Sequence, residues 1–543
     1  MALVVQRIGL LASNQRIEVR FLTRAQIIMQ IAKEVLQIAA ILHANKYKAY
    51  LVGGCLRDLL TDVPPKDWDI ATDALPEQVH LLFPDSVYEN SFGTVGVKTE
   101  SMDPTCKIIE VTTFRTEGSY SDKRRPDEVK FVKTIEEDLA RRDFTVNAMA
   151  VDLTHNLELI TNNEGERFQL LVMSHKLLVD PFGGQHDLVE GMLRAVGDAG
   201  ERFREDALRL MRAVRFHAQL GFKIEKETME ALKAEAKLLE HIAAERIRDE
   251  LTKMIMTKRA GEGIEIMRTT GLLKFVLPEL LDGVGCEQNQ HHIYDVYEHN
   301  LKSLEYSATK GHSLAVRLAA LLHDVGKPAT RVWKDTATGK KVRAGKKGDW
   351  TFYSHQVVGA KMAAKMLTRL HFSNEIIDQV SMLVYEHMFV YDPEIVTLAG
   401  VRRLLARVGA ENIDDLVRVR EADRIGSGVP KAQPYRLRYL LAMIEKVKTD
   451  PISAKMLAIN GEDLMKELKI PAGRLIGQII AVLLEEVLGD PTLNTKEILL
   501  KRAADLAKLS NDELEPLKAK AKERAAAAQN SIDEEIKKRY FVK

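Results

Sequence analysis

The sequence predicts an α+β protein, in which a mixed β-sheet head with helices comes first and helical regions make up the rest of the chain. Three observations lead to this prediction. An apolar run at residues 49–52 is followed by a glycine pair, a short amphipathic turn and a second strand-like run, an order typical of strand, turn, helix and strand. Residues 93–99 and 107–114 are rich in β-forming side chains. From residue 217 to 275 a helical pattern continues with little proline or glycine.

Length and composition indicate a soluble protein of several domains. A chain of 543 residues predicts three or four domains, each with its own core. Lysine plus arginine (79) nearly equals aspartate plus glutamate (78), which excludes a strongly basic coat and leaves RNA contacts to local patches. Cys55, Cys106 and Cys286 are scattered without a CxxC pair, as in a reduced cytoplasmic protein without disulfides or cysteine zinc sites. No apolar stretch approaches the roughly 18 residues that a membrane span needs, and residues 1–25 read as a tail without a secretory signal.

The first strand–turn–strand stretch combines acids with glycines. Alternation along a strand would place Asp67 and Asp69 on one face, and two hard oxygen ligands suit Mg²⁺. The backbone N–H groups of Gly53 and Gly54 can approach a triphosphate closely, and Arg57 can pair with it. The stretch therefore predicts a magnesium and nucleotide site.

The residues LVGGCLRD (51–58) and DWDIATD (67–73) resemble the nucleotidyltransferase superfamily that includes DNA polymerase β. The form is similar to the bacterial class II CCA-adding enzymes and their poly(A) polymerase relatives. The resemblance implies that Asp67 and Asp69 are the catalytic acids holding Mg²⁺, that Gly53, Gly54 and Arg57 bind nucleotide, and that tRNA, ATP and CTP are the partners.

Three further head segments and one candidate acid are expected. Residues 24–47 have helical spacing and lead into the first strand, and residues 76–83 read as a short helix. Residues 115–133 are rich in glycine and charge, which predicts a mobile loop. Glu110 lies in the middle of a strand, either as a third metal ligand or as a surface side chain.

Residues 136–152 join an acidic helix start to two arginines in front of a short apolar strand. Arginines in this position suit a triphosphate or ribose. The run RRDFTVNA resembles the family's second signature motif. The resemblance implies nucleotide binding by Arg142, Asp143 and Asn147.

A helix is expected from about residue 201, on which Asp206, Arg209, Arg212 and Arg215 recur every three residues and share one broad face. A carboxylate accepts from the exocyclic amine of cytosine or adenine while an arginine donates to the ring nitrogen, and guanine and uracil present the opposite order. Glu205-Asp206-x-x-Arg209 resembles the family's protein-template motif. The resemblance implies that Asp206 and Arg209 read the base edge, with Arg212 and Arg215 supporting the site or binding phosphate.

A second constellation lies further along the chain. Adjacent His323 and Asp324 close an apolar helix in LLHDVGKP. Imidazoles and carboxylates spread over several helices suit a divalent site in the core of a bundle. The order resembles the two-metal form of the HD phosphohydrolase superfamily, and Mn²⁺, Ni²⁺ and Mg²⁺ remain open as its ion. The resemblance implies six ligands: His299, His323, Asp324, His355, His387 and Asp423.

The remaining segments are mostly helical. Residues 244–255 resemble the family's neck helix, and residues 334–350, rich in lysine and glycine, predict an exposed hairpin. Residues 456–494 resemble the C-terminal piece of CCA-adding enzymes with an HD domain, where Gly473 and Arg474 either meet the tRNA backbone or pack. Residues 510–543 read as a solvated helix.

The predicted function is template-independent addition of C, C and A to the 3′ end of tRNA from CTP and ATP, with an HD domain that may or may not hydrolyse phosphate esters. Three alternatives stay open: addition of A alone, a poly(A) polymerase, and, from another class, an HD phosphohydrolase that uses its head to bind RNA. The oligomeric state is not predicted. The expected domains are the tail (1–25), the head (26–175), the neck with the template motif (176–275), the HD domain (285–430) and the helical tRNA-binding tail (431–543).

Overall fold

The computed structural model divides the chain into two compact units, Met1–Pro278 and Glu279–Lys543. It describes residues 27–88, 93–117, 129–154, 159–161, 167–172, 178–288, 293–335, 348–448, 450 and 453–509. The predicted N-terminal tail and the predicted helix at 510–543 lie outside this range. No helix within it is both long enough and apolar enough to cross a membrane.

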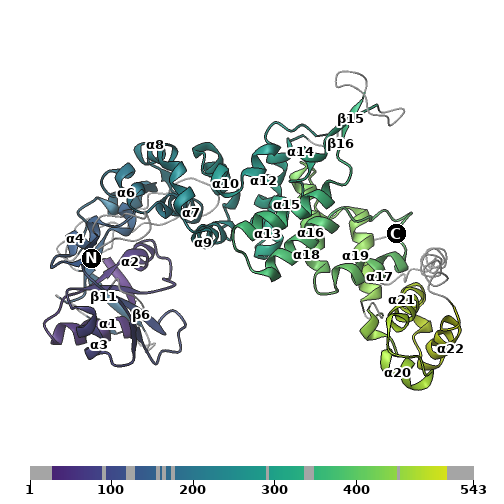
Figure 1. Ribbon diagram of the computed structural model, residues 1–543. Coiled ribbons are helices and arrows are strands. Elements are labelled where there is room, and N and C mark those ends of the chain that lie inside the picture. The colour runs from purple at the N-terminus through teal and green to yellow at the C-terminus, as the bar shows by residue number, and fades with distance from the viewer. Residues whose placement is uncertain are drawn as a thin grey trace. The chain divides into compact units, whose positions relative to one another are not determined.

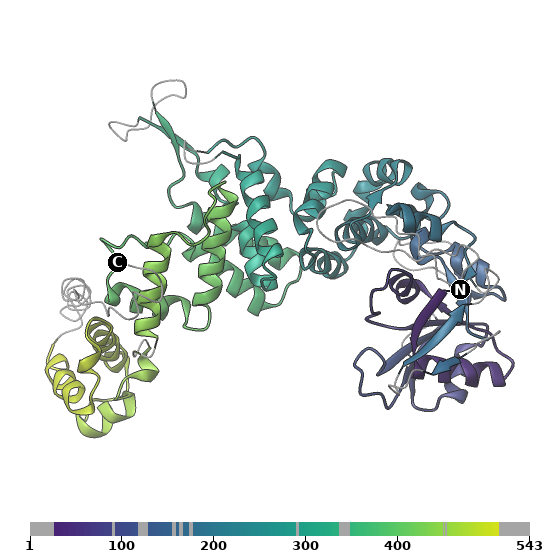
Figure 2. The ribbon, with the colours of Figure 1, turned by 180° about the vertical axis from the view of Figure 1, so that it is seen from behind.

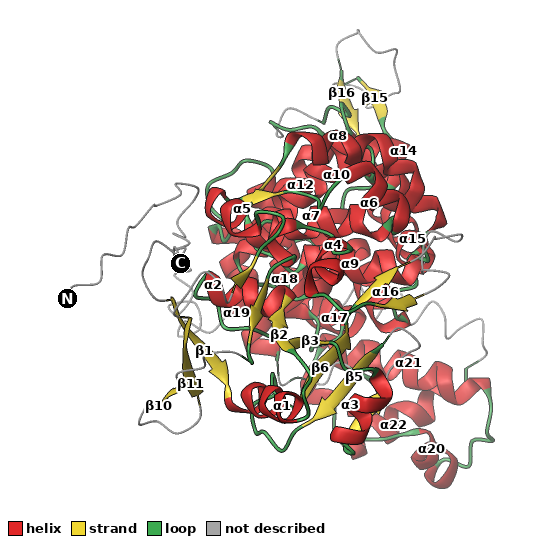
Figure 3. Ribbon diagram, turned by 90° about the vertical axis from the view of Figure 1, so that its left-hand side faces the viewer, coloured by secondary structure: helices red, strands yellow, loops and turns green. Residues whose placement is uncertain are grey.

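The first unit is built on a mixed seven-stranded sheet, as the predicted fold class requires (Figure 1). Only β3 and β6 pair in parallel, and the other neighbours are antiparallel. Figure 3 shows β2, β3, β6 and β5 side by side. In spatial order the strands are β12 Leu178–Val179, β9 Ala150–Asp152, β2 Ala49–Val52, β3 Asp69–Thr72, β6 Ile108–Thr113, β5 Thr94–Lys98 and β4 Ser86–Tyr88.

The expected helix over residues 24–47 is only partly correct. Residues Ile27–Ala32 form strand β1, which pairs antiparallel with β11 (Arg167–Val172), and β11 pairs with β10 (Leu159–Thr161). The sequence IIMQIA favours a strand because β-branched side chains fit a pleated surface. Helix α1 begins only at Lys33 and ends at Ala44.

The expected loop at 115–133 begins and ends as an antiparallel pair of short strands, β7 (Arg115–Glu117) and β8 (Val129–Phe131). The residues between them, 118–128, lie outside the described part of the chain. The other head helices are α2 Gly53–Leu60, α3 Pro76–Leu82 and α4 Ile135–Ala140.

The helix expected to run on from residue 201 is two helices, α6 (Ala199–Glu205) and α7 (Leu208–Leu220). The chain is extended at Asp206, whose Oδ1 accepts a hydrogen bond from the backbone N of Leu208 at 3.0 Å. An aspartate side chain that accepts from the backbone two residues further on favours a turn over a continuous helix. The other helices of this part are α5 Gly184–Glu190, α8 Lys226–Glu235, α9 Ala244–Ile255, α10 Ala260–Thr270 and α11 Leu273–Val276, and β13 (Met192–Leu193) pairs in parallel with β14 (Lys223–Ile224).

The second unit is helical apart from one hairpin (Figure 2). Its first helices surround buried histidines, and α12 packs along α13 and α18. They are α12 Val296–Thr309, α13 Leu314–Leu322, α14 Lys327–Thr330, α15 His355–Arg369, α16 Asn374–Glu386, α17 Leu398–Val408, α18 Ile413–Gly426 and α19 Tyr435–Val447.

Two parts complete the second unit. Strands β15 (Val332–Lys334) and β16 (Asp349–Thr351) form the base of an antiparallel hairpin, where one was expected. Helices α20 (Gly461–Glu467), α21 (Arg474–Gly489) and α22 (Lys496–Leu506) enclose a core of their own that includes Ile479 and Leu483.

Candidate active site and metal centre

Three groups from the two head motifs meet at the start of helix α2. Gly53 has a φ of +75°, a conformation that glycine adopts without strain. A β-carbon added there would lie 3.0 Å from Nη1 of Arg142 and 3.2 Å from Oδ2 of Asp69. A side chain at position 53 would therefore crowd one acid and one cation that come from different segments.

The predicted acids surround Asp69. Asp67 and Asp69 were expected to alternate along one strand. Strand β3 begins only at Asp69, so Asp67 precedes the strand and that expectation is wrong. Glu110 is the partner of Asp69 in the parallel β3–β6 ladder. Burial, followed by the charge of Glu110, raises the pKa of Asp69 to about 7, although Arg142 opposes the shift. Acids that resist ionising next to one another fit a site that takes up a cation.

A buried hydrogen-bond network joins the two head motifs. Arg57 donates from Nη1 to Oδ1 of Asn147 at 2.7 Å, and Nδ2 of Asn147 donates to Oδ1 of Asp143 at 3.3 Å. Asp143 also accepts from Nε of Arg212 at 2.7 Å. Burial alone would raise the pKa of Asp143, but Arg212 overcomes this effect and lowers the pKa to about 2. The network links Arg57 and Arg212 through Asn147 and Asp143, so both arginines support the local fold, and their predicted binding of nucleotide stays a prediction.

Sequence reasoning missed Asp138, a buried acid that holds both arginines of the RRD run. Its Oδ1 accepts from Arg141 at 2.8 Å and its Oδ2 from Arg142 at 3.3 Å. Burial opposes ionisation, but these arginines lower the pKa of Asp138. The spacing of three and four residues along a helix was the signal that could have found it.

The two predicted base-reading residues take separate partners. Asp206 accepts from Nη2 of Arg246 at 3.1 Å, and Arg209 donates to Oε2 of Glu205 at 2.7 Å and to the backbone O of Arg141 at 2.9 Å. The break between α6 and α7 removes Asp206 from the helical face that was expected to carry all four residues. Arg209 remains on α7 and is buried.

The arginines further along α7 have partners within the first unit. Nε of Arg215 lies 2.5 Å from Oε2 of Glu250, which comes from α9 and is also buried. The ring of Phe216 lies against three guanidinium groups, with Cζ at 4.0 Å for Arg215, 5.3 Å for Arg212 and 5.5 Å for Arg57. Arg215 is thus held by an ion pair and a cation–π contact within the neck.

The six predicted ligands of the second constellation lie together in the core of the HD helices. Nε2 of His299 is 3.1 Å from Oδ2 of Asp324 and 3.4 Å from Oδ1 of Asp423. Asp324 is shared by two groups whose ligand atoms lie within 4.8 Å of one another: His299 with His323, and His355 with His387. Within the described residues these two groups of three meet that distance limit. The carboxylate oxygens of the head acids do not, so they lie farther from one another.

The histidine rings are oriented for a cation. Nδ1 of His355 and Nδ1 of His387 each lie 2.7 Å from a backbone carbonyl, which can only accept, so the ring proton is on Nδ1. Their Nε2 atoms then face each other at 3.3 Å with lone pairs. Oδ1 of Asp324 is buried without a hydrogen-bond partner. Facing lone pairs beside an unsatisfied carboxylate oxygen fit a bound divalent ion.

The histidines of this centre have pKa values that are shifted in opposite directions. Burial lowers the pKa of His323, but Asp324 and Asp423 outweigh it and raise that pKa to about 10. Burial and His323 lower the pKa of His387 to about 3. Nζ of Lys327 lies 2.5 Å from Oδ2 of Asp324. Sequence reasoning did not single out Lys327, although it stands three residues after Asp324. The acids therefore require positive charge on one side of the centre, while His387 stays neutral and able to bind a metal.

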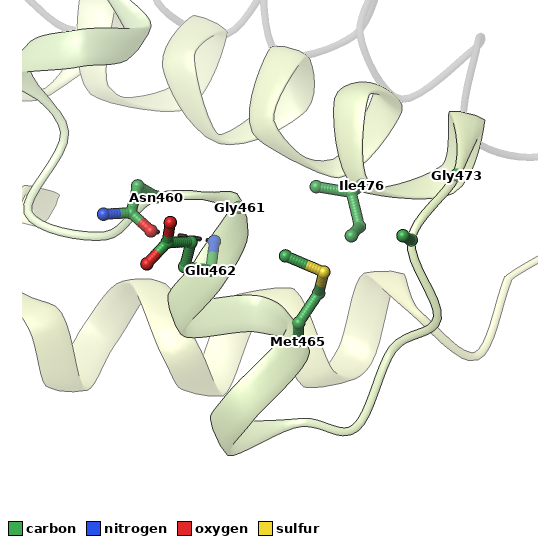
Figure 4. Close-up of a pocket in the computed structure, with 7 residues that line it drawn as sticks. Asn460, Gly461, Glu462, Met465, Gly473 and Ile476 are labelled. Carbon is green, nitrogen blue, oxygen red and sulfur yellow. Dashed lines mark hydrogen bonds between the residues drawn. The ribbon is translucent and has the colours of Figure 1, made fainter.

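Gly473 lines an open pocket of about 480 Å³ (Figure 4), and Arg474 is the first residue of α21. In Figure 4, Met465 and Ile476 face the same space from α20 and α21. Asn460 caps α20 by accepting from the backbone N of Glu462 at 2.8 Å. These contacts account for local packing, and the tRNA contact expected of Gly473 and Arg474 stays a prediction.

The CCA-adding enzyme of Ligilactobacillus salivarius is 33% identical to this chain over 476 residues, which cover 87% of this chain and 96% of that protein. The chain belongs to the family of CCA-adding enzymes. The CCA-adding enzyme of Geobacillus thermodenitrificans is 43% identical over 251 residues, which cover 46% of this chain and only 55% of that protein. A solved structure of the Bacillus stearothermophilus CCA-adding enzyme in complex with CTP matches with a TM-score of 0.61 and 27% identity, over 88% of this chain and 98% of that one.

Three family models match successive parts of this member of the CCA-adding family, in the same order as its sequence motifs. They match the poly A polymerase head domain at residues 49–194, the probable RNA and SrmB-binding site of polymerase A at 221–283, and the HD domain at 296–427. The head and HD domains of such enzymes generally use divalent metals. The acids around Asp69 and the histidine groups around Asp324 are the described candidates.

Proposed function

We propose that this protein is a template-independent tRNA nucleotidyltransferase that adds C, C and A to the 3′ end of tRNA, from CTP and ATP, in the cytoplasm. The observation that supports it most directly is that Asp69 and Arg142 both lie next to the space that a side chain at position 53 would fill. A triphosphate lying against the backbone of Gly53 would meet the metal-binding acid and a guanidinium at once.

The chain's own residues divide the work of nucleotidyl transfer. Asp67 and Asp69 would hold Mg²⁺, which would lower the pKa of the attacking 3′-hydroxyl and neutralise charge on the triphosphate. The N–H groups of Gly53 and Gly54 approach the phosphates, and Arg142 pairs with them. The three groups thus orient the α-phosphate for in-line attack and expulsion of pyrophosphate.

Base selection falls to the residues between α6 and α7. Asp206 accepts two hydrogen bonds, from Leu208 and Arg246, and a carboxylate has about four acceptor positions. It can therefore still accept from the exocyclic amine of cytosine or adenine. Arg209 supplies the donor to the ring nitrogen by exchanging one of its bonds to Glu205 or Arg141.

The test uses full-length protein, Mg²⁺ and three tRNAs that end before CCA, after C and after CC, with CTP and ATP supplied separately and together. Completion of CCA on all three without further growth is the expected result. Extension of the CC end alone would make the protein an A-adding enzyme, and long A tails would make it a poly(A) polymerase. Asp67→Ala should slow addition by at least about 100-fold, the scale on which losing one preorganised electrostatic group slows an enzyme. Glu77→Ala, an exposed acid on α3, is the control and should leave the rate unchanged.

A second activity, hydrolysis of phosphate esters by the HD domain, is supported by the ring orientation at Asp324. His299, His323, His355, His387, Asp324 and Asp423 would hold the divalent ions, of which Mn²⁺, Ni²⁺ and Mg²⁺ are the candidates. Bound ions would supply a water nucleophile at neutral pH. His323→Ala should abolish metal-dependent phosphate release from a terminal or cyclic phosphate while CCA addition persists. Phosphate release at the original rate in this variant would exclude the assignment.

A further inference from the structure

The hairpin of the second unit carries aromatic and basic side chains on both faces. We define the tryptophan hairpin as strands β15 and β16 with the flanking residues Arg331 and Tyr353. Its cross-strand pair, Trp333 and Trp350, stacks edge to face with ring centroids 4.9 Å apart. Cζ of Arg331 lies 3.7 Å from the centre of the Trp350 ring. These contacts stabilise the hairpin itself, so they explain why two of the three tryptophans of the chain lie here.

The opposite face of the tryptophan hairpin is not explained by its own stability. Nζ of Lys334 lies 4.1 Å from the centre of the Tyr353 ring, and Tyr353 is 69% exposed. An exposed aromatic ring leaves apolar surface in contact with water, which is unfavourable for the folded protein. The same pair suits a nucleotide, because the ring can stack on a base while the ammonium approaches a phosphate.

The charge of this segment differs sharply from that of the whole chain. Residues 331–353 contain seven basic and two acidic side chains, a net charge of +5, whereas the complete chain has a net charge of +1. Five of the basic residues belong to 336–347, which lie outside the described part of the chain. A local basic patch is what a nearly neutral protein needs in order to bind a polyanion.

The root of the tryptophan hairpin contacts the HD centre. The backbone O of Phe352 accepts from Nδ1 of His355 at 2.7 Å, and Nζ of Lys327 lies 5.6 Å from the centre of the Phe352 ring. Figures 1 and 2 show β15 and β16 extending outward from the HD helices near α14. The hairpin thus begins beside the HD centre and points into solvent.

We propose that the tryptophan hairpin is a contact element for the tRNA substrate, in which Tyr353 stacks on a base and Lys334 neutralises a phosphate. This inference rests on the proposed RNA substrate. RNA is favoured over an acidic protein because an exposed ring beside a cation fits a stacked base as well as a negative charge.

The test measures the affinity of the full-length protein for a fluorescently labelled tRNA that lacks CCA, at several salt concentrations. Tyr353→Ala should weaken binding about fivefold or more, since base–aromatic stacking contributes at least ~1 kcal/mol per base, and Tyr353→Phe should restore it. Lys334→Glu should weaken binding and lower the slope of log Kd against log salt by about 1. Lys310→Glu is the matched control, because Lys310 is exposed in the same domain and also lies over a tyrosine ring, that of Tyr306, at 5.7 Å.

Nucleotide addition separates failure of this inference from failure of the proposed function. With CTP and ATP, Lys334→Glu and Tyr353→Ala should raise KM for tRNA and leave kcat unchanged. If the wild type extends tRNA but Lys334→Glu and Lys310→Glu bind it equally well, the hairpin is not an RNA contact, although the proposed function stands. A loss of binding to anionic lipid vesicles with unchanged tRNA affinity would also overturn the inference. If the wild type neither binds nor extends tRNA, the proposed function fails first.

Discussion

At the residue scale, Asp69 has the surroundings that matter most for the head chemistry. Asp69 is removed from solvent, and Glu110 on the next strand and Asp67 in front of β3 add negative charge beside it. The positive charge of Arg142 offsets these effects only in part. In the folded protein its pKa is about 7, compared with an ordinary value of 3.8. The folded state therefore binds a proton at Asp69 over a pH range in which the unfolded chain does not.

This raised pKa predicts that Asp69 lowers the free energy of unfolding although nucleotide addition requires it. Ionised Asp69 destabilises the fold, with no cost below about pH 4 and the full cost above about pH 7, because the folded pKa is the higher one. Without Mg²⁺, Asp69→Asn should raise the unfolding free energy of the first unit at pH 8 by roughly 2–4 kcal/mol, and this gain should shrink towards pH 4. With Mg²⁺ present, the same variant should lose nucleotide addition. Denaturant titrations across pH check this. Asp85→Asn, an exposed acid beside Lys98, is the control, and a gain independent of pH would contradict the explanation.

At the scale of elements, helix α7 connects the head motifs to the neck. Arg212 reaches Asp143, which precedes the Thr145–Asn147 turn, and Arg215 reaches Glu250 on α9. Arg209 donates to the backbone of Arg141. Because Arg209 and Arg212 contact the segment around residues 141–143 and Arg215 contacts α9, the helix connects the second head motif to the neck within the first unit.

The pair of Arg215 and Glu250 offers a test of structural against nucleotide-binding roles. Glu250→Gln leaves a buried arginine without its counter-charge and should lower the unfolding free energy of the first unit by about 3–5 kcal/mol. KM for CTP should change little in the remaining folded protein. The double variant Arg215→Met/Glu250→Leu should recover most of the stability, since apolar side chains can replace a buried ion pair. Unchanged stability with a raised KM would instead make Arg215 a nucleotide contact.

At the scale of the whole molecule, the chain consists of two compact units with separate candidate metal sites. The acids around Asp69 belong to the first unit and the ligands around Asp324 to the second. The α20–α22 region has its own apolar core. Each unit can therefore respond to metal on its own.

Removal of metal should separate the two units in calorimetry. An ion present at 100 times its Kd stabilises the folded state by about 2.7 kcal/mol, so a chelator should lower the melting temperature of the transition that belongs to the second unit. Mn²⁺ should restore it in the wild type and not in His387→Ala. The transition of the first unit should respond to Mg²⁺ with CTP and not to His387→Ala. A chelator without effect on either transition would exclude a tightly bound ion at Asp324.

The sequence by itself determined the fold class, the family resemblance and the identity of the residues that bear chemistry. Glycine before a pair of acids, two arginines before a short strand, and histidines in a fixed order along helices are local or ordered patterns, so they can be recognised without coordinates. The structure brings Gly53, Asp69 and Arg142 together, and likewise the six HD ligands. Their catalytic roles stay predictions.

Only the tertiary structure decided which partners those residues have. Arg215 pairs with Glu250 and Arg212 with Asp143 across long stretches of sequence, and periodicity along a helix carries no information about such contacts. The strand at Ile27–Ala32 and the break at Asp206 were missed for the same reason. The first depends on pairing with β11, and the second on hydrogen bonds to Leu208 and Arg246. The pKa of Asp69 likewise depends on Glu110, a neighbour that only the parallel pairing of β3 with β6 brings alongside.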